Sequence, residues 1–133
     1  MIASFVDVQP ECLRILVVED APMHQKLAQG LLTRQGHQVT VTSDGKQAVD
    51  LLKHEDFDVI LMDVEMPVMD GLTATRIIRA REQESGHHTP VVALTSTTDS
   101  QRCLAVGMDA FLHKPLKIDL LNQILQEVLT DAW

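Results

Sequence analysis

Five short runs rich in apolar residues are spaced along the chain, and each is followed by a segment whose apolar residues recur with the period of a helix. The apolar runs cover residues 15–18, 39–42, 59–62, 91–94 and 110–112. The helical segments cover residues 22–35, 43–52, 71–84, 100–106 and 118–130. Regular alternation of this kind predicts an α/β domain, in which helices cover both faces of a parallel sheet.

The second apolar run differs from the others because its side chains alternate between apolar and polar, in the order Val39-Thr40-Val41-Thr42. Such alternation indicates a strand with one wetter face, whereas the wholly apolar run at 15–18 predicts a strand buried on both faces. We therefore place the second strand at an edge. The result is a doubly wound, flavodoxin-like (βα)5 three-layer sandwich with strand order 2-1-3-4-5. In the first helix, Met23, Leu27 and Leu31 recur at i, i+4 and i+8 and form the apolar stripe.

Length and charge limit the function of the chain. The 133 residues suffice for one core. We expect a single domain over residues 13–131, preceded by a leader or linker remnant over residues 1–12. Nineteen acidic against eleven basic residues give a net charge of −8, which disfavours nucleic-acid and anionic-membrane binding. No run reaches membrane-spanning length and no basic secretory region opens the chain, so we expect a cytoplasmic location with Cys12 and Cys103 as reduced thiols.

Polar residues end the central strands of the predicted sheet. Glu19 and Asp20 follow the first strand, and Asp63 follows the third. With strand order 2-1-3-4-5 the strand order reverses between these two strands, and ligands of such sheets bind beyond the carboxyl ends at that point. Three carboxylates there repel one another unless a cation compensates them. Hard oxygen ligands with room for water favour Mg²⁺.

Two further residues complete a set suited to phosphoryl transfer. Thr95 ends the fourth strand, and Lys114 follows the fifth. A lysine supplies a counter-charge for an incoming anion, and a hydroxyl can bond one of its oxygens. Together with a metal, these groups position and neutralise a phosphoryl group, which is most of what catalysis of its transfer requires. An aspartate is the expected acceptor, because carboxylates form acyl phosphates.

Four segments carry a resemblance to a known family. Residues 63–71, DVEMPVMDG, resemble the phosphoacceptor loop of response-regulator receiver domains, and residues 17–20, VVED, resemble their acidic pair. Residues 93–95, ALT, and 111–115, FLHKP, resemble their threonine and lysine motifs. The resemblance covers residues 14 to 130, and all four motifs stand in order at the ends of the right predicted strands.

The resemblance implies a phosphorelay role. Asp63 would take a phosphoryl group from a phosphohistidine on a partner, which is a histidine kinase or a histidine phosphotransfer domain. Asp20, Asp63 and the backbone carbonyl of Glu65 would bind Mg²⁺ directly, and Glu19 would bind it through water. The domain would catalyse only its own phosphorylation and dephosphorylation.

The resemblance also implies a conformational switch. Thr95 and Lys114 would bind the phosphoryl oxygens, and Lys114 would precede Pro115 through a cis peptide. Phe111 stands where the family has its switch aromatic. Its inward movement would remodel the surface formed by the fourth helix, the fifth strand and the fifth helix.

Several alternatives stay open. The residues of the acceptor loop and of the loop at 81–90 resemble those of receivers attached to hybrid sensor histidine kinases, which favours such a receiver over a stand-alone single-domain regulator. A Mg²⁺-dependent phosphohydrolase with an aspartate nucleophile is a rival, as are a nucleotide-binding protein of similar fold and a degenerate receiver that serves as a scaffold. The hydrolase reading is disfavoured because Glu65, and not an aspartate, lies two residues after Asp63. The six histidines share no ligand spacing and are interpreted as surface or loop residues: His24, His37, His54, His87, His88 and His113.

Overall fold

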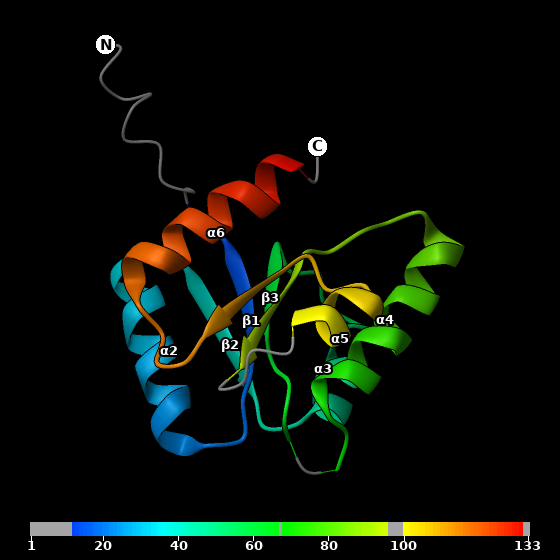
Figure 1. The fold of residues 1–133 in the computed structure, drawn as a ribbon, viewed down its shortest axis with the longest axis horizontal. Coiled ribbons are helices and arrows are strands. Elements are labelled where there is room, and N and C mark those ends of the chain that lie inside the picture. The colour runs from blue at the N-terminus through cyan, green and yellow to red at the C-terminus, as the bar shows by residue number, and fades with distance from the viewer. Residues whose placement is uncertain (1–11, 67, 96–99, 132–133) are drawn as a thin grey trace.

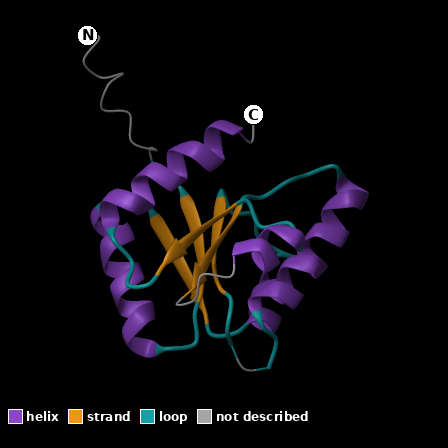
Figure 2. Cartoon of the chain, viewed as in Figure 1, coloured by secondary structure: helices purple, strands orange, loops and turns teal. Residues whose placement is uncertain are grey.

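A computed structural model describes residues 12–66, 68–95 and 100–131 of the chain. Five strands alternate with five helices, as the sequence pattern predicts (Figure 2). The strands are β1 (Arg14–Val18), β2 (Gln38–Thr42), β3 (Val59–Asp63), β4 (Val91–Thr95) and β5 (Ala110–His113). The helices are α2 (Pro22–Arg34), α3 (Gly45–Leu51), α4 (Gly71–Ser85), α5 (Ser100–Ala105) and α6 (Ile118–Asp131).

The five strands form one parallel sheet in the order β2-β1-β3-β4-β5, which confirms the predicted winding. The alternating strand β2 lies at an edge, where only one neighbour shields it. Strands β1 and β3 are adjacent, with Val18 opposite Met62 in the register. This register brings the residues that follow Val18 beside Asp63 at the carboxyl edge of the sheet.

Two hydrophobic layers hold the helices to the sheet. Helices α2 and α6 cover one face, and α3, α4 and α5 cover the other (Figure 1). Alternate residues of each central strand point to opposite layers, so that Ile15 and Val17 pack on the α2 side while Leu16 and Val18 pack on the α4 side. Every residue of β3 and β4 is buried, as expected for central parallel strands.

Local signals explain where the helices near the carboxyl edge begin. The Asp44 side chain accepts a hydrogen bond from the backbone N–H of Gln47, and Asp70 accepts one from that of Thr73, so each caps a helix N-terminus. Helix α4 starts so close to β3 that a Cβ atom on Gly71 would clash with the carbonyl oxygen of Asp63. A glycine at position 71 is therefore needed to hold this loop against the end of β3.

The apolar residues whose spacing predicts helix α2 are mostly not the residues that this helix buries. Met23 is 82% exposed and Leu27 is 42% exposed, whereas Ala28 and Leu32 are the buried residues of this helix. The small side chain of Ala28 allows α2 to approach the sheet closely, and the longer apolar side chains are left beside solvent. Two large apolar side chains thus remain uncovered near the carboxyl edge of the sheet.

Val68 has a backbone conformation that β-branched residues rarely adopt, with φ at 69°. Its side chain is 80% exposed and gains little from packing. Val68→Gly is expected to raise the free energy of unfolding by about 0.5–1 kcal/mol, because relief of the left-handed strain exceeds the added entropy of the unfolded chain. Urea unfolding would measure the gain. Val68→Ala is the control, and an equal gain in that variant would contradict the explanation by strain.

Candidate functional site

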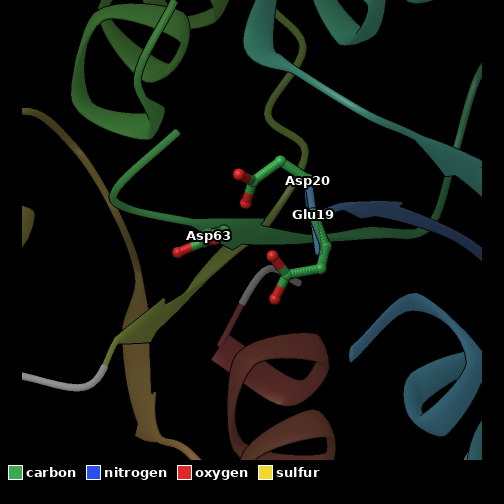
Figure 3. A group of neighbouring side chains, drawn as sticks. All are labelled: Glu19, Asp20 and Asp63. Atoms are coloured by element: carbon green, nitrogen blue, oxygen red, sulfur yellow. The ribbon is translucent and has the colours of Figure 1, made fainter. Parts of the chain in front are cut away.

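Three carboxylates meet at the carboxyl edge of the sheet, as predicted. Glu19 and Asp20 follow β1, and Asp63 ends the adjacent strand β3. One carboxylate oxygen from each lies within 4.8 Å of the others (Figure 3). Glu19 and Asp63 are buried, whereas Asp20 is exposed at the mouth of the site.

Lys114 reaches into this cluster from the end of β5. Its Nζ lies 2.7 Å from Oε1 of Glu19 and 3.3 Å from Oδ2 of Asp63. The peptide bond between Lys114 and Pro115 is cis, as the resemblance implies. The backbone N–H of Lys114 also donates to the carbonyl oxygen of Thr95, at 2.9 Å, which holds the loop after β5 against the end of β4.

A single lysine, Lys114, contacts both buried carboxylates, and its one charge cannot neutralise two. Burial and the neighbouring Glu19 raise the pKa of Asp63 to about 7. Burial also disfavours ionisation of Glu19, but hydrogen bonds from Asp63, Lys114 and the N–H of Ala21 outweigh it and lower the pKa of Glu19. Lys114 is the closer counter-ion of Glu19, so Asp63 is the carboxyl group that keeps its proton. Burial opposes the charge of Lys114, yet its contacts with Glu19 and Asp63 raise its pKa.

The residues present fit a hard divalent cation. The donors are carboxylate oxygens, one of them exposed, and the repulsion between the buried pair is the charge that a cation would compensate. A hollow of about 160 Å³ opens beside them. Its lining includes all the predicted site residues except Phe111: Glu19, Asp20, Asp63, Glu65, Thr95 and Lys114, with Ala21 and His24.

Glu65 and Thr95 also line this hollow. The backbone N–H of Glu65 donates to Oδ1 of Asp63 at 3.2 Å, which fixes the orientation of that carboxyl group. The Glu65 side chain is exposed. Thr95 is buried at the end of β4, one strand away from Asp63.

Phe111 lies outside the hollow. Its half-buried ring packs against the core layer under α3, α4 and α5 and meets the ring of His113 edge-on, with the centroids 5.9 Å apart. The sequence alone does not distinguish this arrangement from a fully buried one. Phe111 lies on β5, three residues before Lys114.

His24 is a residue of this site that the sequence analysis missed. Its Nδ1 lies 3.1 Å from Oε1 of Glu19 and 3.3 Å from Nζ of Lys114. The signal was available, because His24 falls in the first turn of a helix that Pro22 starts directly after the acidic pair.

The interpretation of the six histidines as surface or loop residues holds for His24, which is exposed, but it is wrong for His37. That ring is buried, its Nδ1 accepts a hydrogen bond from the backbone N–H of Leu13, and burial lowers its pKa. His54, His87, His88 and His113 are exposed, as predicted. Within the described ranges, Glu19, Asp20 and Asp63 form the one cluster of three potential metal ligands.

Comparisons with known proteins agree with this geometry. The family described as "Response regulator receiver domain" matches residues 15–126. The chain is 40% identical to hybrid signal transduction histidine kinase I of Dictyostelium discoideum, over 84% of this chain and 7% of the kinase. It is 38% identical to the sensor histidine kinase AruS of Pseudomonas aeruginosa, over 90% of this chain and 12% of the kinase. The chain therefore spans only a small part of these relatives.

Two solved structures are similar in fold. One is the receiver domain of the sensor histidine kinase PA1611 from Pseudomonas aeruginosa, with a magnesium ion in its active-site cleft. It is 42% identical, with a TM-score of 0.80 over 90% of this chain and 98% of that one. The other is the receiver domain of Ssk1 in complex with the phosphotransfer protein Ypd1 from Saccharomyces cerevisiae. It is 25% identical, with a TM-score of 0.84 over 96% and 95%.

None of the helices in the described ranges has the length and apolar character needed to cross a membrane. The motifs, the strand order, the acidic cluster with its lysine, and the match over most of the chain agree with one another. The chain belongs to the response-regulator receiver domains and is homologous to those of hybrid histidine kinases.

Proposed function

We propose that Asp63 is the phosphoacceptor of a phosphorelay and that Mg²⁺ is the cofactor. Asp20, Asp63 and the backbone carbonyl of Glu65 would hold the ion, and Glu19 would hold it through water. A bound Mg²⁺ would neutralise phosphoryl oxygens and the second carboxylate charge. The observation that carries the proposal is a buried aspartate whose one close cation among the described residues, Lys114, lies nearer to Glu19.

The transfer itself needs few protein groups. A carboxylate oxygen of Asp63 attacks the phosphorus of a phosphohistidine, and the P–N bond breaks as the new P–O bond forms. The electron pair of the broken bond returns to the imidazole, which then gains a proton. Lys114, 3.3 Å from Asp63, and the hydroxyl of Thr95 would contact the phosphoryl oxygens during this step.

The same contacts would couple the site to a distant surface. When Thr95 turns toward the phosphoryl group, the space that it leaves would let Phe111 move further inward. Its ring is only half-buried beside His113, so an inward movement would bury more of its surface. The surface of α5, β5 and α6 would then adopt a second packing, and the phosphoryl group would favour it by binding it more tightly.

The phosphoryl donor would be a histidine kinase or a histidine phosphotransfer domain. A small apolar pocket of about 50 Å³ lies next to the mouth of the site, lined in part by Leu27, Ala28, Leu94 and Leu116, and it borders Glu19, His24 and Lys114. The exposed Met23 lies on α2, the helix that carries Leu27 and Ala28. A protein partner whose phosphohistidine reaches Asp63 would cover this pocket, and its apolar lining suits an apolar side chain of such a partner.

The kind of protein in which this receiver domain occurs is also a proposal. The described relatives favour a receiver within a hybrid sensor histidine kinase, in which residues 13–131 are the receiver and the domain works in the cytoplasm. The proposed leader at residues 1–12 falls almost wholly outside the described residues. A stand-alone regulator is the alternative, and the full-length gene product would distinguish the two.

The experiment that tests the acceptor is chemical mapping. The protein is incubated with acetyl phosphate, with and without Mg²⁺, and the acyl phosphate is reduced with borohydride before peptide mass spectrometry. We expect Mg²⁺-dependent modification at Asp63 alone. Modification at another carboxyl group would overturn the assignment, and continuous turnover of a generic phosphate ester would favour the hydrolase alternative.

A further inference from the structure

The Glu19 carboxylate, Lys114 ammonium and His24 imidazole form a triangle at the edge of the site. Lys114 Nζ is 2.7 Å from Oε1 of Glu19, and Nδ1 of His24 is 3.1 Å from that oxygen and 3.3 Å from Nζ. Glu19 is 1% exposed, whereas the His24 side chain is 51% exposed. Two groups able to donate hydrogen bonds therefore surround one oxygen of a buried carboxylate.

The geometry makes the two contacts of His24 exclusive. A neutral imidazole carries at Nδ1 either a proton, which it can donate to Glu19, or a lone pair, which can accept from Lys114. Lys114 contacts a second carboxylate as well, since its Nζ lies 3.3 Å from Oδ2 of Asp63. A phosphoryl group on Asp63 would bring three more acceptor oxygens to that side and draw Lys114 away from Glu19.

In the proposed metal-bound state a water on Mg²⁺ would serve one oxygen of Glu19, so the oxygen that Lys114 contacts, Oε1, needs a substitute donor when Lys114 moves. A phosphorylated Asp63 has no proton to donate to Glu19, and the donor that remains within the described residues is the backbone N–H of Ala21, which bonds Oε2 at 3.2 Å and not Oε1. Solvent reaches only 1% of the residue. A buried carboxylate oxygen without a donor destabilises the state in which it occurs.

We propose that His24 is a positioning residue of the phosphorylated state. As Lys114 turns to the phosphoryl group on Asp63, Nδ1–H of the neutral His24 ring replaces it as the donor to Oε1 of Glu19. The inference rests on the proposed function, because it requires Lys114 to bind the phosphoryl oxygens. His24 touches neither the phosphoryl group nor Asp63 and acts only through Glu19.

Two substitutions separate the donor from the shape of the side chain. Asparagine places its amide nitrogen at the position along the side chain that Nδ1 occupies in histidine, and leucine places a methyl group there. Beryllofluoride with Mg²⁺ serves as the phosphoryl mimic, and its dissociation constant is followed by NMR. We expect His24→Leu to bind the mimic about tenfold more weakly than wild type and His24→Asn to bind it within about threefold.

Controls distinguish this role from packing. His54→Leu replaces another exposed histidine away from the site and is expected to bind the mimic as wild type does. Thermal unfolding without the mimic is expected to be the same for wild type and both His24 variants, because Lys114 still serves Glu19 in that state. At pH 8, ring ¹⁵N shifts of mimic-bound wild type are expected to show His24 protonated at Nδ1.

The outcomes are separable. Mimic affinity unchanged in His24→Leu, or lost equally in both variants, would overturn the role of the Nδ1 donor, and so would a ring protonated at Nε2 in the bound state. Failure of the wild type to bind the mimic at all would instead overturn the proposed function.

Discussion

Asp63→Asn is expected to accept no phosphoryl group and, without Mg²⁺ at pH 8, to be more stable than the wild type. The amide cannot form the acyl phosphate, so incorporation from acetyl phosphate with Mg²⁺ should fall to background. The same change removes a charge that burial and Glu19 disfavour, and the amide can still donate to Glu19. We expect a gain of about 2–4 kcal/mol in the free energy of unfolding, from the raised pKa.

The pH dependence shows whether this explanation is right. The pKa of Asp63 is about 7 in the folded protein against 3.8 for an ordinary aspartate. Between these values the folded state holds a proton that the unfolded state has lost, so the contribution of Asp63 to stability falls as pH rises, by at most about 1.4 kcal/mol per pH unit. The lowered pKa of buried His37 acts in the opposite direction in wild type and in Asp63→Asn alike, so the slope due to Asp63 is the difference between the two. Glu19 adds little slope above about pH 5.5, because its pKa is lowered in the folded state and it is almost fully ionised in both states there.

Urea unfolding in EDTA at pH 5, 6, 7 and 8 would measure this slope. The slope should be present in the wild type and in Asp56→Asn, an exposed control, and reduced in Asp63→Asn. Saturating Mg²⁺ should flatten it in the wild type, because a bound cation favours the ionised carboxylate. Parallel curves for wild type and Asp63→Asn would show that Asp63 is ionised throughout, and the assignment of the retained proton would then be wrong.

The fold could be predicted from the sequence because its periodicities are strong. Apolar runs at β1, β3 and β4 and an alternating run at β2 leave few ways to wind the sheet, and the structure has the predicted order. The convergence of Glu19 and Asp63 follows from that order, since adjacent parallel strands end at the same edge. This part of the site depends on the backbone alone.

The features that could not be predicted from the sequence depend on side-chain packing. Periodicity alone does not decide between the Met23 and Leu27 stripe and the Ala28 and Leu32 stripe of α2, because the closer approach that a small residue permits is a tertiary effect. The division of Lys114 between two carboxylates is likewise set by side-chain positions. The uncovered residues on α2 then become the feature that a partner would use.

Met23→Glu is expected to slow phosphoryl transfer from a protein donor by roughly 30-fold or more, because a charge would replace an apolar contact at the proposed docking surface. Met23 is 82% exposed on α2, so the folded domain loses no buried contact when glutamate replaces it. Glutamate is also a good helix former. Stability in urea should therefore change by less than about 0.5 kcal/mol.

The measurement is single-turnover transfer from a purified phosphorylated histidine phosphotransfer domain that phosphorylates the wild type. Acetyl phosphate serves as the second donor, and it should phosphorylate Met23→Glu at the wild-type rate because a small molecule needs no docking surface. Leu104→Glu is the matched control, since Leu104 is 53% exposed on α5, on the opposite face of the sheet. Transfer slowed equally in both variants, or only in Leu104→Glu, would place the protein donor elsewhere than on α2.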